Sequence, residues 1–211
     1  TYHGANRLGA NSLLSASVDG WFTLPFTVPN YLADHLNEPL IDENDPAIQE
    51  AVDRARKHID YFLNNDGPDP HGPDYYHTKL GKLLYYACGV AREDHTTRDG
   101  IAKIRELRAD FMKNVRVPGR GDEMNQVLER TLRLYDYFTL AELMCVDALD
   151  RDESCGAHYR LDHLSDEGEA ERDDEHWCFV SAWEDNGEGK FIRHAEPLHF
   201  ESIPLQTRNY K

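Results

Sequence analysis

The chain has 211 residues, of which 40% are hydrophobic, enough for the packed core of one large domain or two small ones. Acidic side chains outnumber basic ones by 39 to 23, and the net charge of −16 repels nucleic-acid phosphates and anionic lipid surfaces. Composition therefore argues against a nucleic-acid partner, and no apolar stretch approaches the ~20 residues that a membrane span requires.

The first 30 residues combine a glycine-rich opening with an apolar run. The opening reads HGANRLGANSLL over residues 3–14, and its pair Asn11-Ser12 is a potential helix cap. The apolar residues that follow predict a buried helix, which we expect Pro25 and Pro29 to end. Residues 31–45 have the composition of a linker.

A first amphipathic helix is predicted to begin at Asp45-Pro46, because aspartate caps helix ends and proline fits the first helical position. Apolar residues recur along it at helical spacing: Ile48, Val52, Ala55, Ile59 and Phe62. The glycine- and proline-rich segment 64–74 ends this helix, and the tyrosine- and leucine-rich residues 75–91 predict a shorter second helix.

Two further helices are predicted before residue 150. Thr97 is the expected cap of the third, whose apolar stripe comprises Ile101, Ile104, Leu107, Phe111 and Val115. The turn VPGRGD (117–122) reverses the chain, and a long fourth helix runs from Met124 to about Leu149. Residues 46–152 are therefore expected to form an antiparallel helical bundle domain, with the aromatic and methionine side chains as its core.

The last part of the chain, residues 153–211, differs in character. An acidic loop over 164–175 precedes strand-like alternation on both sides of Asn186-Gly187, which is a strong hairpin signal. We therefore expect a C-terminal loop and β-hairpin region. The predicted fold is mainly α (α+β).

Metal and disulfide chemistry is not indicated. Cys88, Cys145, Cys155 and Cys178 are scattered without a C-x-x-C pair, and no histidine cluster has zinc spacing. We expect reduced thiols and histidines that are packed or on the surface. No metal site is predicted.

The opening motif has the chemistry of an anion site. Gly4 and Gly9 allow the backbone to approach a ligand closely, and the unpaired N–H groups at the start of a helix favour negative charge. Arg7 adds a planar guanidinium that can grip a carboxylate through two parallel hydrogen bonds. The residues alone therefore predict an anion-binding junction between a strand and a helix.

Three ordered motifs carry a family resemblance over essentially the whole chain. They are the opening HGANRLGANSLL, the segment ESCGAHYR (153–160), and the acidic RDDEHW (172–177), followed by the ending LQTRNYK (205–211). The chain thereby resembles the flavoprotein subunit of succinate dehydrogenase and fumarate reductase. It is most similar to bacterial forms in which ESCGAH replaces the commoner ESRGAH, so that Cys155 stands where many relatives have arginine.

The resemblance implies roles for four residues of the opening motif. Arg7 is expected to bind one carboxylate of a dicarboxylate substrate. Ser12 and Leu13, with Asn11 beside them, are expected to contact the isoalloxazine end of FAD. Residues 1–30 would then be the terminal piece of an FAD-binding domain. The chain has no G-x-G-x-x-G after a strand, so this segment alone should be inactive, with no catalytic residue of its own.

The implied function is oxidation of succinate to fumarate, or the reverse, by hydride transfer with FAD. Electrons would pass to an iron–sulfur subunit and quinone, and a membrane-anchor subunit would hold the complex indirectly on the cytoplasmic side of the bacterial inner membrane. L-aspartate oxidase is a rival, although it typically reads ANRLASNSL, and Gly9-Ala10 here favours the dehydrogenase. A helical interaction module without catalytic activity, derived from such a subunit, is the other alternative.

Overall fold

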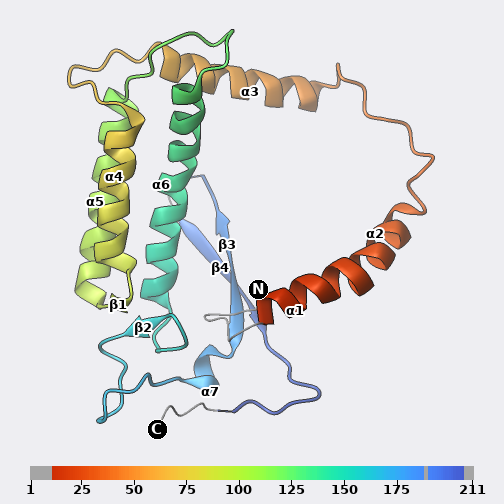
Figure 1. The fold of residues 1–211 in the computed structure, drawn as a ribbon, viewed down its shortest axis with the longest axis vertical. Coiled ribbons are helices and arrows are strands. Elements are labelled where there is room, and N and C mark those ends of the chain that lie inside the picture. Colours follow the sequence, from red (N-terminus) through yellow and green to blue (C-terminus); the bar gives the residue numbers. More distant parts are fainter. Residues whose placement is uncertain (1–10, 188–189, 207–211) are drawn as a thin grey trace.

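The computed structural model describes residues 11–187 and 190–206 (Figure 1). Its elements are an N-terminal helical arm, a helix that crosses one end of a bundle, three long packed helices, and a C-terminal hairpin. The fold is therefore mainly α with a small β part, and this confirms the fold class predicted from the sequence.

The arm consists of α1 (Asn11–Val18), the π-helical segment η1 (Asp19–Thr23) and α2 (Leu24–Leu32). Two expectations about it were wrong. The prolines do not end the helix: Pro25 lies in the first turn of α2, where a missing N–H is tolerated, and Pro29 is accommodated inside it. The arm is also not buried, because it projects away from the bundle in Figure 1 and Trp21 is 78% exposed.

Helix α3 (Pro46–Leu63) begins as the sequence predicts. The Asp45 carboxylate accepts a hydrogen bond from the N–H of Ala47 at 2.8 Å, and Pro46 occupies the first turn. Figure 1 shows α3 lying across one end of the bundle. It contributes the fully buried Phe62 to the core.

Helices α4 (Pro73–Cys88), α5 (Asp94–Asn114) and α6 (Gln126–Asp150) form the bundle and alternate in direction (Figure 1). Phe111 lies at the centre of its core, with ring centroids 5.5 Å from Phe62, 5.4 Å from Tyr76 and 5.1 Å from Phe138. The predicted apolar stripes therefore do pack together. Asn125 caps α6 by accepting from the N–H groups of Val127 and Leu128.

The predicted cap of α5 was wrong. This helix starts at Asp94, three residues before Thr97, with Glu93 in the cap position. Thr97 is buried, and its hydroxyl donates to the carbonyl of Ala87 on α4 at 2.8 Å. A hydroxyl-bearing residue near a helix start can cap the helix or bond to a neighbouring helix, and the tertiary packing selects the second.

The C-terminal region is tied to the bundle at two places. The short strand β1 (Ala91–Arg92) pairs in parallel with β2 (Tyr159–Arg160), which joins the α4–α5 connection to the segment after α6. After the short α7 (Asp174–Trp177), β3 (Phe179–Asp185) and β4 (Phe191–Pro197) form an antiparallel hairpin.

The hairpin turns where the sequence predicts, with Gly187 at φ +75°. It lies against α6, because the Trp183 Nε1–H donates to Asp147 at 2.6 Å and Arg193 pairs with Asp150 at 2.8 Å. Within the part of the chain that the structure describes, no helix has the length and apolar character needed to cross a membrane.

Candidate functional site

The predicted flavin contacts lie at the start of the arm. Asn11 is the first described residue and lies in α1, and its side-chain oxygen Oδ1 is buried and has no hydrogen-bond partner among the described residues. Ser12 is half-buried in the same turn, and Leu13 is 75% exposed. A buried amide oxygen left without a donor is energetically costly unless a group outside the structure satisfies it.

Arg7, predicted to hold a substrate carboxylate, lies outside the described residues, as do Gly4 and Gly9. The structure places the predicted cofactor contacts in the first described turn of α1. It gives no geometry for the predicted substrate ligand.

A network of buried polar side chains lies just after the C-terminal end of α6, in the segment ESCGAHYR (153–160). Glu153, Ser154, His158 and Arg160 are each at most 6% exposed. The Glu153 carboxylate accepts from the Arg151 guanidinium and from the backbone N–H of Asp173 at 2.9 Å. The network thereby ties the end of α6 to the loop that leads into α7.

His158 is held in one neutral form by two neighbours. The Arg92 guanidinium donates to its Nδ1 at 2.7 Å, so Nδ1 accepts and the proton is on Nε2, which donates to the carbonyl of Arg151 at 2.8 Å. Burial, and then the positive charges of Arg92 and Arg160, lower the pKa of His158. With both ring nitrogens occupied, His158 positions other groups and is not free to act as a base.

Arg160 closes the end of α6. Its guanidinium forms two hydrogen bonds with Asp162, at 3.0 and 2.5 Å, and donates to the carbonyl of Leu149 at 3.3 Å. The hydrogen bond from Arg160 holds the pKa of Asp162 below its usual value. Through these contacts the segment satisfies a carbonyl at the C-terminal end of the helix.

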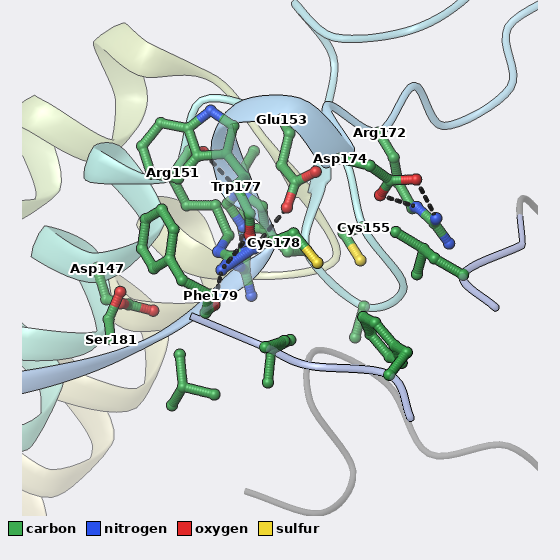
Figure 2. A pocket seen from close by; sticks show the side chains of 17 residues that line it. Asp147, Arg151, Glu153, Cys155, Arg172, Asp174, Trp177, Cys178, Phe179 and Ser181 are labelled. Atoms are coloured by element: carbon green, nitrogen blue, oxygen red, sulfur yellow. Dashed lines mark hydrogen bonds and ion pairs between the residues drawn. The ribbon is translucent and has the colours of Figure 1, made fainter. Parts of the chain in front are cut away.

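A cavity of about 630 Å³ lies beside this network, between the end of α6, α7 and β3 (Figure 2). Four charged side chains of its wall form two ion pairs and so neutralise one another: Arg151 pairs with Glu153, and Arg172 pairs with Asp174 at 2.5 Å. The guanidinium of Arg151 also lies over the rings of Trp177 and Phe179, with 5.7 and 5.5 Å to the ring centroids.

Cys155 lines this cavity as a thiol that is not activated. Burial and the Glu153 carboxylate raise the pKa of Cys155, which lines it, and so disfavour a reactive thiolate. Residues 11–187 and 190–206 contain no group of three or more metal-ligating side chains. Sequence reasoning did not identify the cavity, although the motif RDDEHW supplies Arg172, Asp174 and Trp177 to its wall.

Comparisons with known proteins agree on one family. A family model described as the C-terminal part of the fumarate reductase flavoprotein matches residues 77–210. The fumarate reductase flavoprotein subunit of Helicobacter pylori is 30% identical over 177 residues, which cover 83% of this chain and 22% of that protein. That of Escherichia coli is 31% identical over 172 residues, covering 82% and 26%. The chain thus spans about a quarter of the length of these relatives.

Structural comparison gives the same answer. A chain of Escherichia coli quinol fumarate reductase superposes with a TM-score of 0.78 at 26% identity, covering 97% of this chain and 33% of that one. An L-aspartate oxidase from Synechocystis is more distant, at 25% identity over 76% of this chain and 28% of that protein. The chain therefore belongs to the fumarate reductase and succinate dehydrogenase flavoprotein family and corresponds to its C-terminal part.

Proposed function

We propose that this chain is the C-terminal part of a flavoprotein subunit that interconverts succinate and fumarate with FAD and passes electrons to an iron–sulfur subunit and quinone. Membership of the family carries the proposal, since its relatives are named as fumarate reductase flavoprotein subunits. The complex would lie on the cytoplasmic side of the bacterial inner membrane, held there through a membrane-anchor subunit.

The side chains of residues 11–13 fit a place in a flavin site. The orphaned Oδ1 of Asn11 is a buried hydrogen-bond acceptor without a donor among the described residues, and a polar group of the flavin could supply that donor. Ser12 would add a hydroxyl contact, and the exposed Leu13 would add apolar surface. FAD, when bound, would supply the acceptor or donor of a hydride at the succinate carbon.

Arg7 is proposed to bind and orient a substrate carboxylate through its two parallel N–H groups. Its contribution would be positioning, which can supply several kcal/mol of rate acceleration when it fixes the reacting carbon. We also propose that residues 1–30 complete an FAD-binding domain, that 31–45 are a linker, that 46–152 form a bundle domain, and that 153–211 form a C-terminal region.

The exposed apolar side chains of the arm support the proposal that this chain is part of a larger flavoprotein. The side chains of Trp21, Phe22 and Phe26 are each at least 64% exposed, and Leu13 and Tyr31 are both 75% exposed. A helix this apolar normally packs against further protein, because exposed apolar surface costs about 25 cal/mol per Å². We propose that the rest of the FAD-binding domain covers the arm, and that the 211-residue segment alone is inactive.

The test uses the longer flavoprotein that carries this chain. Purified protein is assayed for succinate oxidation with an artificial electron acceptor, for fumarate reduction, and for L-aspartate oxidation. We expect the first two activities. L-aspartate oxidation alone would support the L-aspartate oxidase alternative, and absence of all three activities with a folded protein would support the non-catalytic module.

A variant pair tests the flavin contact separately. Asn11→Ala removes the buried amide oxygen, so we expect less bound flavin per protein by absorbance and lower succinate oxidation. Asn30→Ala removes an exposed amide from α2 of the same arm and should change neither. Equal flavin content in the two variants would remove Asn11 from the cofactor site.

A further inference from the structure

The turn of the hairpin holds an exposed Asn-Gly pair that the proposed function does not use. Asn186 and Gly187 follow Asp185, the last residue of β3, and all three residues are exposed. Gly187 has φ +75°, a conformation that residues with a side chain rarely adopt, and a Cβ built there would meet nothing within 4 Å. Water therefore reaches both the Asn186 side chain and the backbone that follows it.

The covalent structure of an Asn-Gly pair permits a reaction within the chain. The backbone nitrogen of Gly187 is four bonds away from the Asn186 amide carbon Cγ, so attack of this nitrogen on Cγ closes a five-membered ring. Attack within one molecule has a high effective concentration, and glycine places no Cβ beside the attacking nitrogen. Two obstacles remain, because the nitrogen has to lose its proton and the amide oxygen has to carry negative charge.

The structure supplies a base for the attacking nitrogen. The Gly187 N–H donates a hydrogen bond to Oδ1 of Asp185 at 2.8 Å. A general base has to lie within about 2.6–3.2 Å of the atom whose proton it removes, and this carboxylate meets that requirement. Asp185 is therefore in place to take the proton from the nitrogen that attacks Asn186.

The structure also supplies a donor for the amide oxygen. The backbone N–H of Lys190 donates to Oδ1 of Asn186 at 3.3 Å, and the Asn186 N–H donates to the carbonyl of Lys190 at 3.3 Å. An N–H group held at this oxygen stabilises the negative charge that develops there during the attack. The turn thus brings together the nucleophile, the base and the oxyanion donor of one reaction.

We propose that the Asp185-Asn186-Gly187 turn is a self-deamidating site, at which the Asn186 side-chain amide is the substrate and water is the co-reactant. The Asp185 carboxylate takes the Gly187 proton, the nitrogen bonds to Cγ, and the Lys190 N–H holds the negative oxygen. The bond between Cγ and the amide nitrogen then breaks, and this nitrogen leaves as ammonia with the proton that Asp185 had taken. Water opens the cyclic imide at either carbonyl, which gives isoaspartate or aspartate, and no electrons are transferred.

The reaction changes the charge and the backbone of the turn. One neutral side chain becomes negative, so the net charge of the chain goes from −16 to −17. In the isoaspartate form, the main chain also gains a methylene group next to Asp185 and Phe191, the last pair of the hairpin register. The modified protein should therefore elute later than the parent on an anion exchanger.

Trypsin isolates the site in one peptide. Residues 173–190 contain Asn186 as their sole asparagine and contain no glutamine, so replacement of an amide by a carboxyl in this peptide reports Asn186 alone. The longer flavoprotein is kept at neutral pH and physiological temperature, and samples are digested at intervals for mass spectrometry. We expect first-order conversion of the peptide into two products, isoaspartate and aspartate. An unchanged peptide after a month would overturn the proposal.

The synthetic peptide 173–190 gives the rate without the folded turn. The peptide has the same Asn-Gly pair, but its base and oxyanion donor are not held in place. The folded protein should therefore deamidate faster than the peptide. A slower reaction in the folded protein would mean that the turn protects Asn186, which contradicts the proposal.

A matched pair of variants tests the base. Asp185→Ala removes the carboxylate that accepts from the Gly187 N–H, and we expect deamidation to slow by about tenfold or more. Glu184→Ala removes a neighbouring exposed carboxylate, which lies 2.8 Å from Nε2 of His194, and should leave the rate within about twofold of the parent. Equal rates in the two variants would refute Asp185 as the base.

A third variant checks the ring closure. Asn186→Gln keeps a side-chain amide in the turn but moves its carbon one bond further from the Gly187 nitrogen, so the peptide 173–190 should keep its mass. Conversion of this variant at the rate of the parent would refute attack by the Gly187 nitrogen.

Discussion

Two glycines in the bundle give a matched test of the helix packing. A Cβ on Gly100 of α5 would lie 2.1 Å from the Cβ of Ala87 on α4, whereas a Cβ on Gly81 of α4 would meet nothing within 4 Å. Both substitutions to alanine gain about 1 kcal/mol of helix propensity. Their difference therefore isolates the steric contact between α4 and α5.

The magnitude follows from that distance. Carbon atoms in contact lie about 3.5–4.0 Å apart, so the two Cβ atoms would have to separate by about 1.5 Å. Neither alanine can rotate its Cβ away, and the helix backbones must move. Overpacking of this kind costs about 1–3 kcal/mol, and we take the upper end because only backbone can yield. After the propensity gain, Gly100→Ala should destabilise the fold by about 2 kcal/mol.

Thermal unfolding followed by circular dichroism measures both variants. Gly81→Ala should raise the melting temperature by about 2–4 °C, and Gly100→Ala should lower it by about 4–8 °C. Both variants should keep the helical spectrum of the parent chain. A Gly100→Ala melting temperature equal to or above that of Gly81→Ala would refute the close approach of α4 and α5.

Three further outcomes are expected. In the longer flavoprotein, Arg7→Lys keeps the positive charge but loses the planar guanidinium. We therefore expect kcat/KM for succinate to fall by roughly thirty- to a thousandfold, which corresponds to about 2 to 4 kcal/mol, with flavin content unchanged. Near-normal activity would remove Arg7 from the substrate site. The pKa of His158 is lowered in the folded state, so the unfolded chain takes up the proton first as pH falls below about 6.5. The free energy of unfolding therefore decreases below that pH. The melting temperatures at pH 7.5 and 5.5 should differ less for His158→Gln than for wild type. The 211-residue chain alone should show a strongly helical spectrum yet bind neither free FAD nor succinate tightly, and a yellow complex that survives gel filtration would contradict this.

The sequence was sufficient for the elements whose signals are local. Helix α3 was predicted from Asp45-Pro46 and its apolar spacing, and the hairpin was predicted from Asn186-Gly187, because caps and turns depend on residues only a few positions apart. The family also followed from short motifs, since the opening segment and ESCGAHYR are contiguous strings.

Errors arose where the local signal was ambiguous. Thr97 satisfies the rule for a cap, but its hydroxyl bonds to Ala87 of another helix. Pro25 and Pro29 satisfy the rule for a helix end, but the arm continues through them. In each case several local arrangements have similar free energies, and contacts or positions set by the rest of the fold select among them.

Only the tertiary structure brought together groups that lie far apart in the chain. The neutral form of His158 depends on Arg92, which is 66 positions away, and the hydrogen bond from the Cys88 thiol to the carbonyl of Met144 depends on how α4 packs against α6. No periodicity or motif encodes such contacts, because they arise from the way whole helices pack. Sequence alone determined the family of this protein and the elements whose signals are local, and packing decided which side chains are neutral, buried or paired.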